Sequence, residues 1–257
     1  MIIRERENDF VMIEQKNHAQ FAGDVMAQWK TILFQGEKLR KSVDYAIRMH
    51  DYGWENLDKS PFWNDKKQVP YSLFDFPKAP KIIFYTYGID EVEKVDAYAA
   101  LLCSRHYIQF FLKDSSEESQ AFLKQEEERK NRIIAGLGHF DKHIFDFHYA
   151  LLALGDTLSV YACVNEPGAT EETIHPFFKK GLSLSEELGL NEVNMQPSWI
   201  DEETIALDVF PFEDSINSRL IQKVVSKAAI MEKGLLDSYN EAEYEEVRIC
   251  VKSISKS

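Results

Sequence analysis

The stretch that decides the fold is residues 140–164, FDKHIFDFHYALLALGDTLSVYACV. Its apolar residues recur at helical pitch around the whole circumference, and a helix that is apolar all round is typically buried. We therefore predict that this segment forms the central helix of the core. One acidic residue, Asp156, lies in its second half among leucines. A buried carboxylate needs a cation, a metal or hydrogen-bond donors.

The segments before this helix also have the periodicity of helices. Asn17 is a favourable N-cap and places His18 in the first turn of its helix. The next helix is expected to stop at Gly53. Residues 61–80 contain four prolines and predict an ordered, lid-like loop instead. The helices predicted before the central one cover residues 17–29, 39–52, 96–112 and 120–134.

Short apolar stretches at both ends of the chain predict a small sheet. Residues 2–4 and 10–13 flank a turn-forming segment and predict a hairpin. Residues 204–210 and 247–251 alternate as strands do, and a helix is predicted over residues 216–231 between them. We therefore expect a mainly α (α+β) fold in which N- and C-terminal strands form one small antiparallel sheet.

The composition limits the partners and the compartment. The formal net charge of −13 opposes attraction to a polyanion, so nucleic acid and anionic membranes are poor partners. Three scattered cysteines are too few for a disulfide framework, which fits a reducing compartment. The charged start of the chain does not resemble a secretory signal, so we expect a cytoplasmic protein. The uninterrupted apolar stretches fall short of the roughly 18 residues of a membrane span.

Five residues of metal-ligand type lie on four of the predicted helices: His18, His50, Asp51, His106 and Asp156. Imidazole and carboxylate donors together suit iron, manganese, nickel or zinc. Successive side chains on a helix point about 100° apart, so an adjacent His-Asp pair can share one ion only near a helix end. The second predicted helix, residues 39–52, ends directly after His50 and Asp51, so this pair meets that condition.

Each candidate ligand also has a purely structural interpretation. His50 lies beside Ala46 and Ile47 and could be a hydrogen-bonded core residue. Asp51 could simply end its helix. Asp156 could pair with Arg105 or with a lysine.

Two resemblances follow from these residues. The order of His18, the dipeptide His50-Asp51 and a distant Asp156 on an apolar helix resembles the HD-domain superfamily of metal-dependent phosphohydrolases, as far as about Val164. More narrowly, several strings resemble a bacterial family of unknown function with an H-D-x-G-W motif. These strings are MIIR at residues 1–4, HDYGW at 50–54, ALLCSRH at 100–106 and VFPF at 209–212.

The first resemblance implies an HD-like helical bundle. On this interpretation the chain is a single domain, residues 1–257, in which an N-terminal hairpin (1–15) precedes the helical core (16–164). The C-terminal strands and helix (165–257) pack on that core. The resemblance also implies a divalent metal, Mn, Fe, Ni, Zn or Mg, with His106 matching an extra histidine of binuclear members. The implied ligands are His18, His50, Asp51 and Asp156.

The function expected from this resemblance is hydrolysis of a small soluble phosphoester by a metal-activated water. Asp51 would bind the metal and orient the water, while His106 or Arg105 would contact the phosphate or the leaving oxygen. Two alternatives remain open: a di-iron oxygenase on the same scaffold, and a non-catalytic binding or regulatory domain with a vestigial site. A homo-oligomer is possible. Four aromatic residues could wall the pocket, and Lys66 and Lys67 could meet a phosphate. The aromatic residues are Trp54, Trp63, Tyr71 and Phe74.

Overall fold

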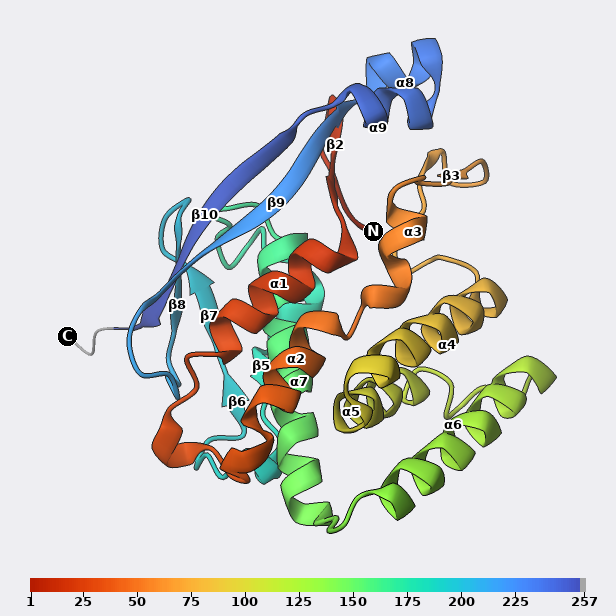
Figure 1. The fold of residues 1–257 in the computed structure, drawn as a ribbon. Coiled ribbons are helices and arrows are strands. Elements are labelled where there is room, and N and C mark those ends of the chain that lie inside the picture. The colour runs from red at the N-terminus through yellow and green to blue at the C-terminus, as the bar shows by residue number, and fades with distance from the viewer. Residues whose placement is uncertain (255–257) are drawn as a thin grey trace.

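The computed structural model describes residues 1–254, which form an α+β fold (Figure 1). The main sheet has six strands in the order β1-β2-β9-β10-β8-β7. These strands are β1 (Ile2–Glu5), β2 (Asp9–Ile13), β7 (Pro197–Trp199), β8 (Thr204–Leu207), β9 (Ile216–Ser226) and β10 (Tyr244–Ser253). Two short hairpins join β3 (Trp63–Asn64) to β4 (Val69–Pro70) and β5 (Leu182–Ser183) to β6 (Asn194–Met195).

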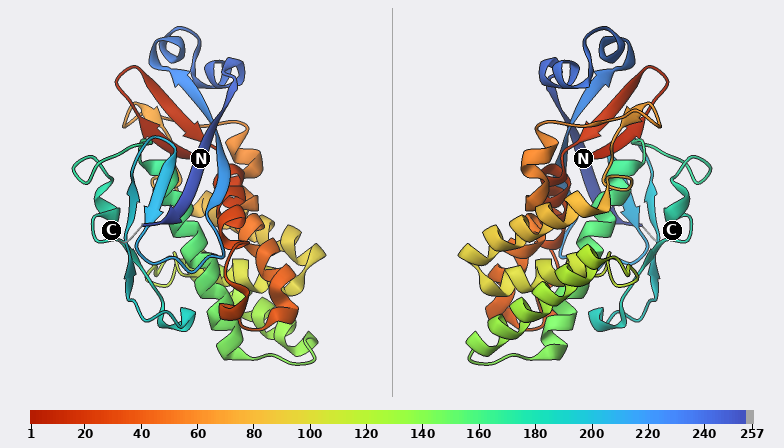
Figure 2. Two further views of the ribbon diagram at one scale, coloured as in Figure 1. Left: turned by 90° about the vertical axis from the view of Figure 1, so that its left-hand side faces the viewer. Right: turned by 90° about the vertical axis from the view of Figure 1, so that its right-hand side faces the viewer.

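The helices form successive layers beside this sheet (Figure 2). Helix α1 packs on β9, and α7 packs on β1. Helix α2 packs on α1 and α7, α5 packs on α2 and α7, and α4 and α6 pack on α5. The α-helices are α1 (Gln15–Met26), α2 (Arg40–Met49), α3 (Glu55–Asp58), α4 (Lys78–Val95), α5 (Ala97–Ile108), α6 (Glu117–Gly136), α7 (Lys142–Val164), α8 (Lys227–Lys233) and α9 (Leu235–Glu241). Short 3-10 turns are η1 (Thr31–Leu33), η2 (Glu37–Leu39), η3 (Tyr52–Trp54), η4 (Pro176–Phe178) and η5 (Glu186–Leu188).

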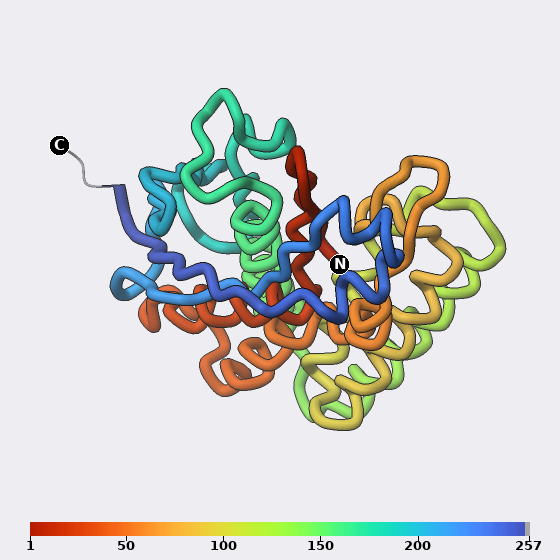
Figure 3. The backbone as a smooth tube through the Cα atoms, turned by 90° about the horizontal axis from the view of Figure 1, so that it is seen from above, coloured from red at the N-terminus to blue at the C-terminus, as the bar shows by residue number. Residues whose placement is uncertain are grey.

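The two ends of the chain share one sheet, as predicted. Strands β1 and β2 form the expected antiparallel hairpin, with Ile2 opposite Ile13. Strand β2 then pairs with β9, so the N-terminal segment lies beside the C-terminal strands (Figure 3). The sheet is mixed rather than antiparallel, because β10 pairs antiparallel with β9 but parallel with β8.

The prediction of a helix over residues 216–231 is wrong, and this error made the expected sheet too small. Ile216, Leu220 and Val224 recur every four residues, which fits a helix. In the structure, residues 216–226 instead form β9, paired on both sides by β2 and β10. Pairing on both edges outweighs a weak local preference, and only α8 at the end of the segment is helical.

The central helix is confirmed as α7. It begins after Asp141, whose side chain accepts hydrogen bonds from the backbone N–H groups of His143 and Ile144. Its length and composition would also allow it to cross a membrane, in contrast to the expectation from shorter apolar stretches. However, 67% of its most apolar 18-residue window is buried inside the protein, and a core helix meets the same criteria.

Helix α1 begins earlier than predicted, and Asn17 is not its N-cap. The N-cap position is Glu14, which makes no side-chain capping bond. The buried carboxylate of Asp58 accepts a hydrogen bond of 2.5 Å from the backbone N–H of Gln15 instead. A residue 43 positions away thus satisfies the first turn, and no local pattern could reveal it.

The second helix ends before Gly53, and the glycine has another role. Helix α2 stops at Met49 with His50 as C-cap, and Gly53 lies in η3 without a positive φ. A Cβ at Gly53 would lie 2.1 Å from the carbonyl oxygen of Phe84 in α4. Gly53 therefore permits close approach of η3 to α4 rather than a left-handed helix end.

The prediction for residues 61–80 is correct only in part. The segment contains the β3–β4 hairpin and an irregular stretch, but α4 already begins at Lys78 and includes Pro80. Proline is tolerated there because the first turn lacks intrahelical partners for its N–H groups. The predicted helices over residues 96–112 and 120–134 are confirmed as α5 and α6, with Asp96 and Ser116 as N-caps.

Candidate metal centre

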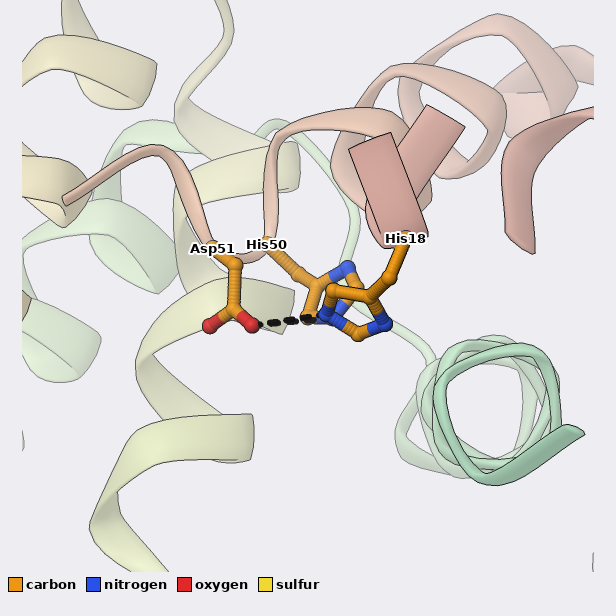
Figure 4. A group of neighbouring side chains, drawn as sticks. All are labelled: His18, His50 and Asp51. Atoms are coloured by element: carbon orange, nitrogen blue, oxygen red, sulfur yellow. Dashed lines mark hydrogen bonds and ion pairs between the residues drawn. The ribbon is translucent and has the colours of Figure 1, made fainter. Parts of the chain in front are cut away.

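Five side chains of the described residues converge where α1, α2, α5 and α7 meet. His18 comes from α1, His50 and Asp51 from the end of α2, His106 from α5 and Asp156 from α7. They form two overlapping groups that share His50, and within each group one ligand atom per residue lies within 4.8 Å of the others. Figure 4 shows the rings of His18 and His50 and the carboxylate of Asp51 directed toward one another.

The interatomic distances place the donor atoms around a common point. His18 Nε2 lies 2.8 Å from Asp51 Oδ2. His50 Nε2 lies 3.4 Å from Asp156 Oδ1 and 3.7 Å from Asp51 Oδ2. His106 Nε2 lies 3.8 Å from Asp156 Oδ2. These buried His and Asp groups could hold a metal ion.

The hydrogen bond of His50 determines which ring nitrogen faces the cluster as an acceptor. Its Nδ1 lies 2.7 Å from the carbonyl oxygen of Ile47. A carbonyl only accepts, so Nδ1 carries the proton. In the neutral ring, Nε2 then presents a lone pair, and this fully buried atom has no hydrogen-bond partner among the described residues. Histidines that bind a metal through one ring nitrogen almost always donate the other N–H in this way, so His50 has the orientation that a metal ligand needs.

His18 is oriented in the same way through Ser159. The Ser159 hydroxyl donates to the carbonyl oxygen of Asp156 at 2.7 Å. It can therefore only accept from His18 Nδ1, which also lies 2.7 Å away. With Nδ1 donating to Ser159, His18 Nε2 faces the Asp51 carboxylate at 2.8 Å, and a proton or a cation must lie between these two atoms.

Two further side chains hold the Asp51 carboxylate in place. Gln15 Nε2 donates to Oδ2 at 2.8 Å, and the Tyr107 hydroxyl donates to Oδ1 at 3.2 Å. The Oε1 atom of Gln15 is buried and has no hydrogen-bond partner within residues 1–254. A buried acceptor of this kind is costly unless a water or ligand donates to it.

The pKa values within the cluster are strongly perturbed. Burial opposes charge on His50, but the carboxylates of Asp51 and Asp156 outweigh it and raise the pKa of His50 to about 9. Burial also opposes ionisation of both aspartates, but the neighbouring imidazoles outweigh it and lower their pKa values. Burial lowers the pKa of His106 to about 4, so this ring is neutral at pH 7. At pH 7 the cluster thus combines two ionised carboxylates with the neutral nitrogen of His106, and a divalent ion that binds His50 must displace the proton held between its ring and the carboxylates.

A cavity of about 440 Å³ opens from the cluster to the surface. Its wall includes four cluster residues, His18, Asp51, His106 and Asp156, together with aromatic residues and two lysines, Lys78 and Lys81. The Asp156 side chain is 21% exposed, so a small molecule in the cavity can reach it. The volume falls in the usual range for small-molecule sites, roughly 300–1,000 Å³.

The structure does not bring Arg105 to this site. Its side chain is exposed, and the guanidinium stacks over the ring of Tyr149 at 5.0 Å, outside the cavity. Arg105 immediately precedes His106 in α5. The helical step of about 100° between neighbouring residues therefore turns its side chain away from the cluster. The purely structural interpretation of Asp156, an ion pair with Arg105 or a lysine, also fails. The side chains that surround its carboxylate are histidines.

The basic residues of the cavity also differ from the expected ones. Lys67 pairs with Asp75, and neither Lys66 nor Lys67 lines the cavity. In their place, Lys81 lies on the cavity wall, where it donates a hydrogen bond of 2.5 Å to the carbonyl oxygen of Leu73. Of the expected aromatic wall, Trp54 and Phe74 line the cavity, whereas Trp63 and Tyr71 do not.

Sequence reasoning missed the residues that support the ligands: Gln15, Tyr107 and Ser159. All three lie within three residues of a candidate ligand along the chain. Their roles nevertheless depend on how the helices pack, and for Gln15 on the approach of α1 to Asp51 at the end of α2.

The fold and the cluster together define an α+β protein with a buried His/Asp centre below a cavity. The chain belongs to the family described as Protein of unknown function (DUF3891), whose model matches residues 1–227. Searches of curated proteins and of solved structures returned no match. The assignment to the HD-domain superfamily is therefore wrong. The matching family model is a different one. The structure also has a six-stranded mixed sheet, where the resemblance implied a helical bundle with only a small sheet.

Proposed function

We propose that this protein is a metal-dependent phosphohydrolase that acts on a small soluble phosphoester. The observation that carries the proposal is the Nε2 atom of His50, which is fully buried, unpartnered and directed at two carboxylates. A polar atom in this position costs free energy unless it binds something. A divalent cation satisfies it and both aspartates at once.

Four residues would hold the ion: His18, His50, Asp51 and Asp156. Their mixed nitrogen and oxygen donors suit Mn, Fe, Ni or Zn, and Mg to a lesser degree. A bound divalent ion supplies an activated water near neutral pH and polarises a phosphoryl oxygen.

The side chains around the ion then have separate tasks. Gln15 and Tyr107 fix the Asp51 carboxylate, and the unpartnered Oε1 of Gln15 can accept a hydrogen bond from the attacking water. His106, neutral and on the cavity wall, can bind the ion or contact the phosphoryl group. Lys81 offers positive charge in the same cavity, as a phosphate ligand requires.

The cavity and the charge of the chain support a small substrate. About 440 Å³ accommodates a compound of drug-like size, and the net charge of −13 disfavours a nucleic acid. The three cysteines are free thiols, which fits a reaction in the cytoplasm.

The proposal is tested by the metal content and the activity of the purified protein. Protein prepared without chelator is expected to contain a divalent metal and to hydrolyse p-nitrophenyl phosphate when supplied with Mn, Fe, Ni, Zn or Mg. His50→Ala and Asp51→Ala should each lose metal and activity. The matched control is His139→Ala, since His139 is exposed and outside the cluster.

The alternatives give different results in the same experiment. Bound iron with absorption in the visible region and no phosphatase activity would replace the proposal by an oxygenase. Protein without metal after purification and after metal supplementation would leave a non-catalytic binding domain.

A further inference from the structure

Three phenylalanines from distant segments line the cavity and remain largely exposed. Phe74 precedes α4, Phe110 follows α5 and Phe177 lies in η4. Their exposed fractions are 61%, 52% and 70%, respectively. Single exposed aromatics are common on proteins, but several at one opening mark a surface that binds an apolar group.

The aromatic wall begins directly beside the His/Asp cluster. The ring of Phe110 makes an edge contact with His106, with ring centroids 5.3 Å apart. Tyr85 and Phe111 continue this wall, with centroids 6.0 Å apart. A group attached to a phosphoryl oxygen at the cluster would therefore lie against aromatic rings.

The polar side chains of the cavity wall offer little to a polar body. Beyond the residues that contact Asp51, they are already bonded within the protein. The bonds are Lys78 to Asp114, Lys81 to the carbonyl of Leu73, Gln109 to His106 and Thr157 to the carbonyl of Ala153. A sugar or a base would have to compete with these bonds for partners on entering, whereas an apolar body would not.

We propose that the substrate of this site is a phosphomonoester of an apolar alcohol, with its apolar body held between Phe74, Phe110 and Phe177. The inference rests on the proposed function for the reaction itself. A water oxygen would bond to phosphorus, the ester P–O bond would break, and a proton from the water would pass to the leaving alcohol oxygen. Lys81 would face the phosphoryl group.

The preference is measured by comparing 1-naphthyl phosphate with glycerol 2-phosphate on the metal-loaded full chain. The expected kcat/KM is at least tenfold higher for the naphthyl ester. In the double variant Phe74→Ala/Phe177→Ala, KM for the naphthyl ester should rise about tenfold while kinetics with glycerol 2-phosphate stay unchanged. The control Phe62→Ala removes another ring that is 54% exposed but lies outside the cavity. It should leave the kinetics with both esters unchanged.

A binding measurement separates this inference from the proposed function. Calorimetric titration with 1-naphthylmethylphosphonate, which cannot be hydrolysed, should show binding that weakens in the double variant. Such binding without turnover of either ester would support the apolar site and overturn the hydrolase. Equal turnover of both esters, unaffected by the double variant, would overturn the apolar site and support the hydrolase. Absence of phosphonate binding would also overturn the apolar site.

Discussion

Replacing Ser159 by alanine removes one hydroxyl and tests how the cluster selects its metal-binding tautomer. In the native protein this hydroxyl accepts from His18 Nδ1 and leaves Nε2 free for an ion. Ser159 is fully buried, so water cannot readily take its place. In Ser159→Ala the proton can move to Nε2, where it bonds to Asp51, and it must then be removed before a metal binds.

The expected loss of metal affinity is about 10–100-fold, as is typical for residues that orient a ligand. This corresponds to about 1.4–2.7 kcal/mol. The assay is a competition titration of the metal-free protein with a chromophoric chelator. The matched control is Ser238→Ala, because Ser238 is also buried and its hydroxyl also donates to a backbone carbonyl within its own segment, far from the cluster.

The control should bind metal as tightly as the native protein. Unchanged affinity in Ser159→Ala would show that the hydroxyl does not set the tautomer, and the geometric reasoning about His18 would be refuted. An equal loss in both serine variants would point to general destabilisation instead.

Two further predictions concern stability. Burial lowers the pKa of His148 to about 4, so its contribution is present above the ordinary pKa of about 6.5 and is lost as the pH falls toward 4. The free energy of unfolding should therefore lose about 2 kcal/mol between pH 7 and pH 5 through this residue, measured by urea unfolding, and His148→Gln should lack that part. Gly53→Ala brings a Cβ within 2.1 Å of a Phe84 carbonyl oxygen and should cost about 1–3 kcal/mol or more. The melting temperature should fall by several degrees, whereas Gly136→Ala, with open space at the Cβ, should keep it; equal melting temperatures would contradict the close approach.

The sequence was most informative where a local pattern and the tertiary environment agree. The apolar helix α7 and the hairpin of β1 and β2 have strong periodicity, and both are confirmed. The strand β9 was misread because its apolar spacing also fits a helix. Helix α4 was not predicted, because one proline precedes its first turn and another lies within it.

The candidate site shows the same division. The residue types and their order along the chain were enough to select His18, His50, Asp51, His106 and Asp156, which the structure brings together. The direction of a side chain on its helix was not available from order alone, so Arg105 was included although it points elsewhere. The supporting bonds from Ser159 and Gln15 depend on helix packing, which no local pattern encodes.

The most direct test of the central claim is a crystal structure of the metal-loaded protein with anomalous diffraction data collected at the absorption edge of the bound metal. The account predicts one anomalous peak about 2.0–2.2 Å from His50 Nε2, with His18, Asp51 and Asp156 also in the coordination sphere. A metal bound elsewhere, or no peak at this cluster in protein soaked with Mn, Fe, Ni and Zn in turn, would contradict it.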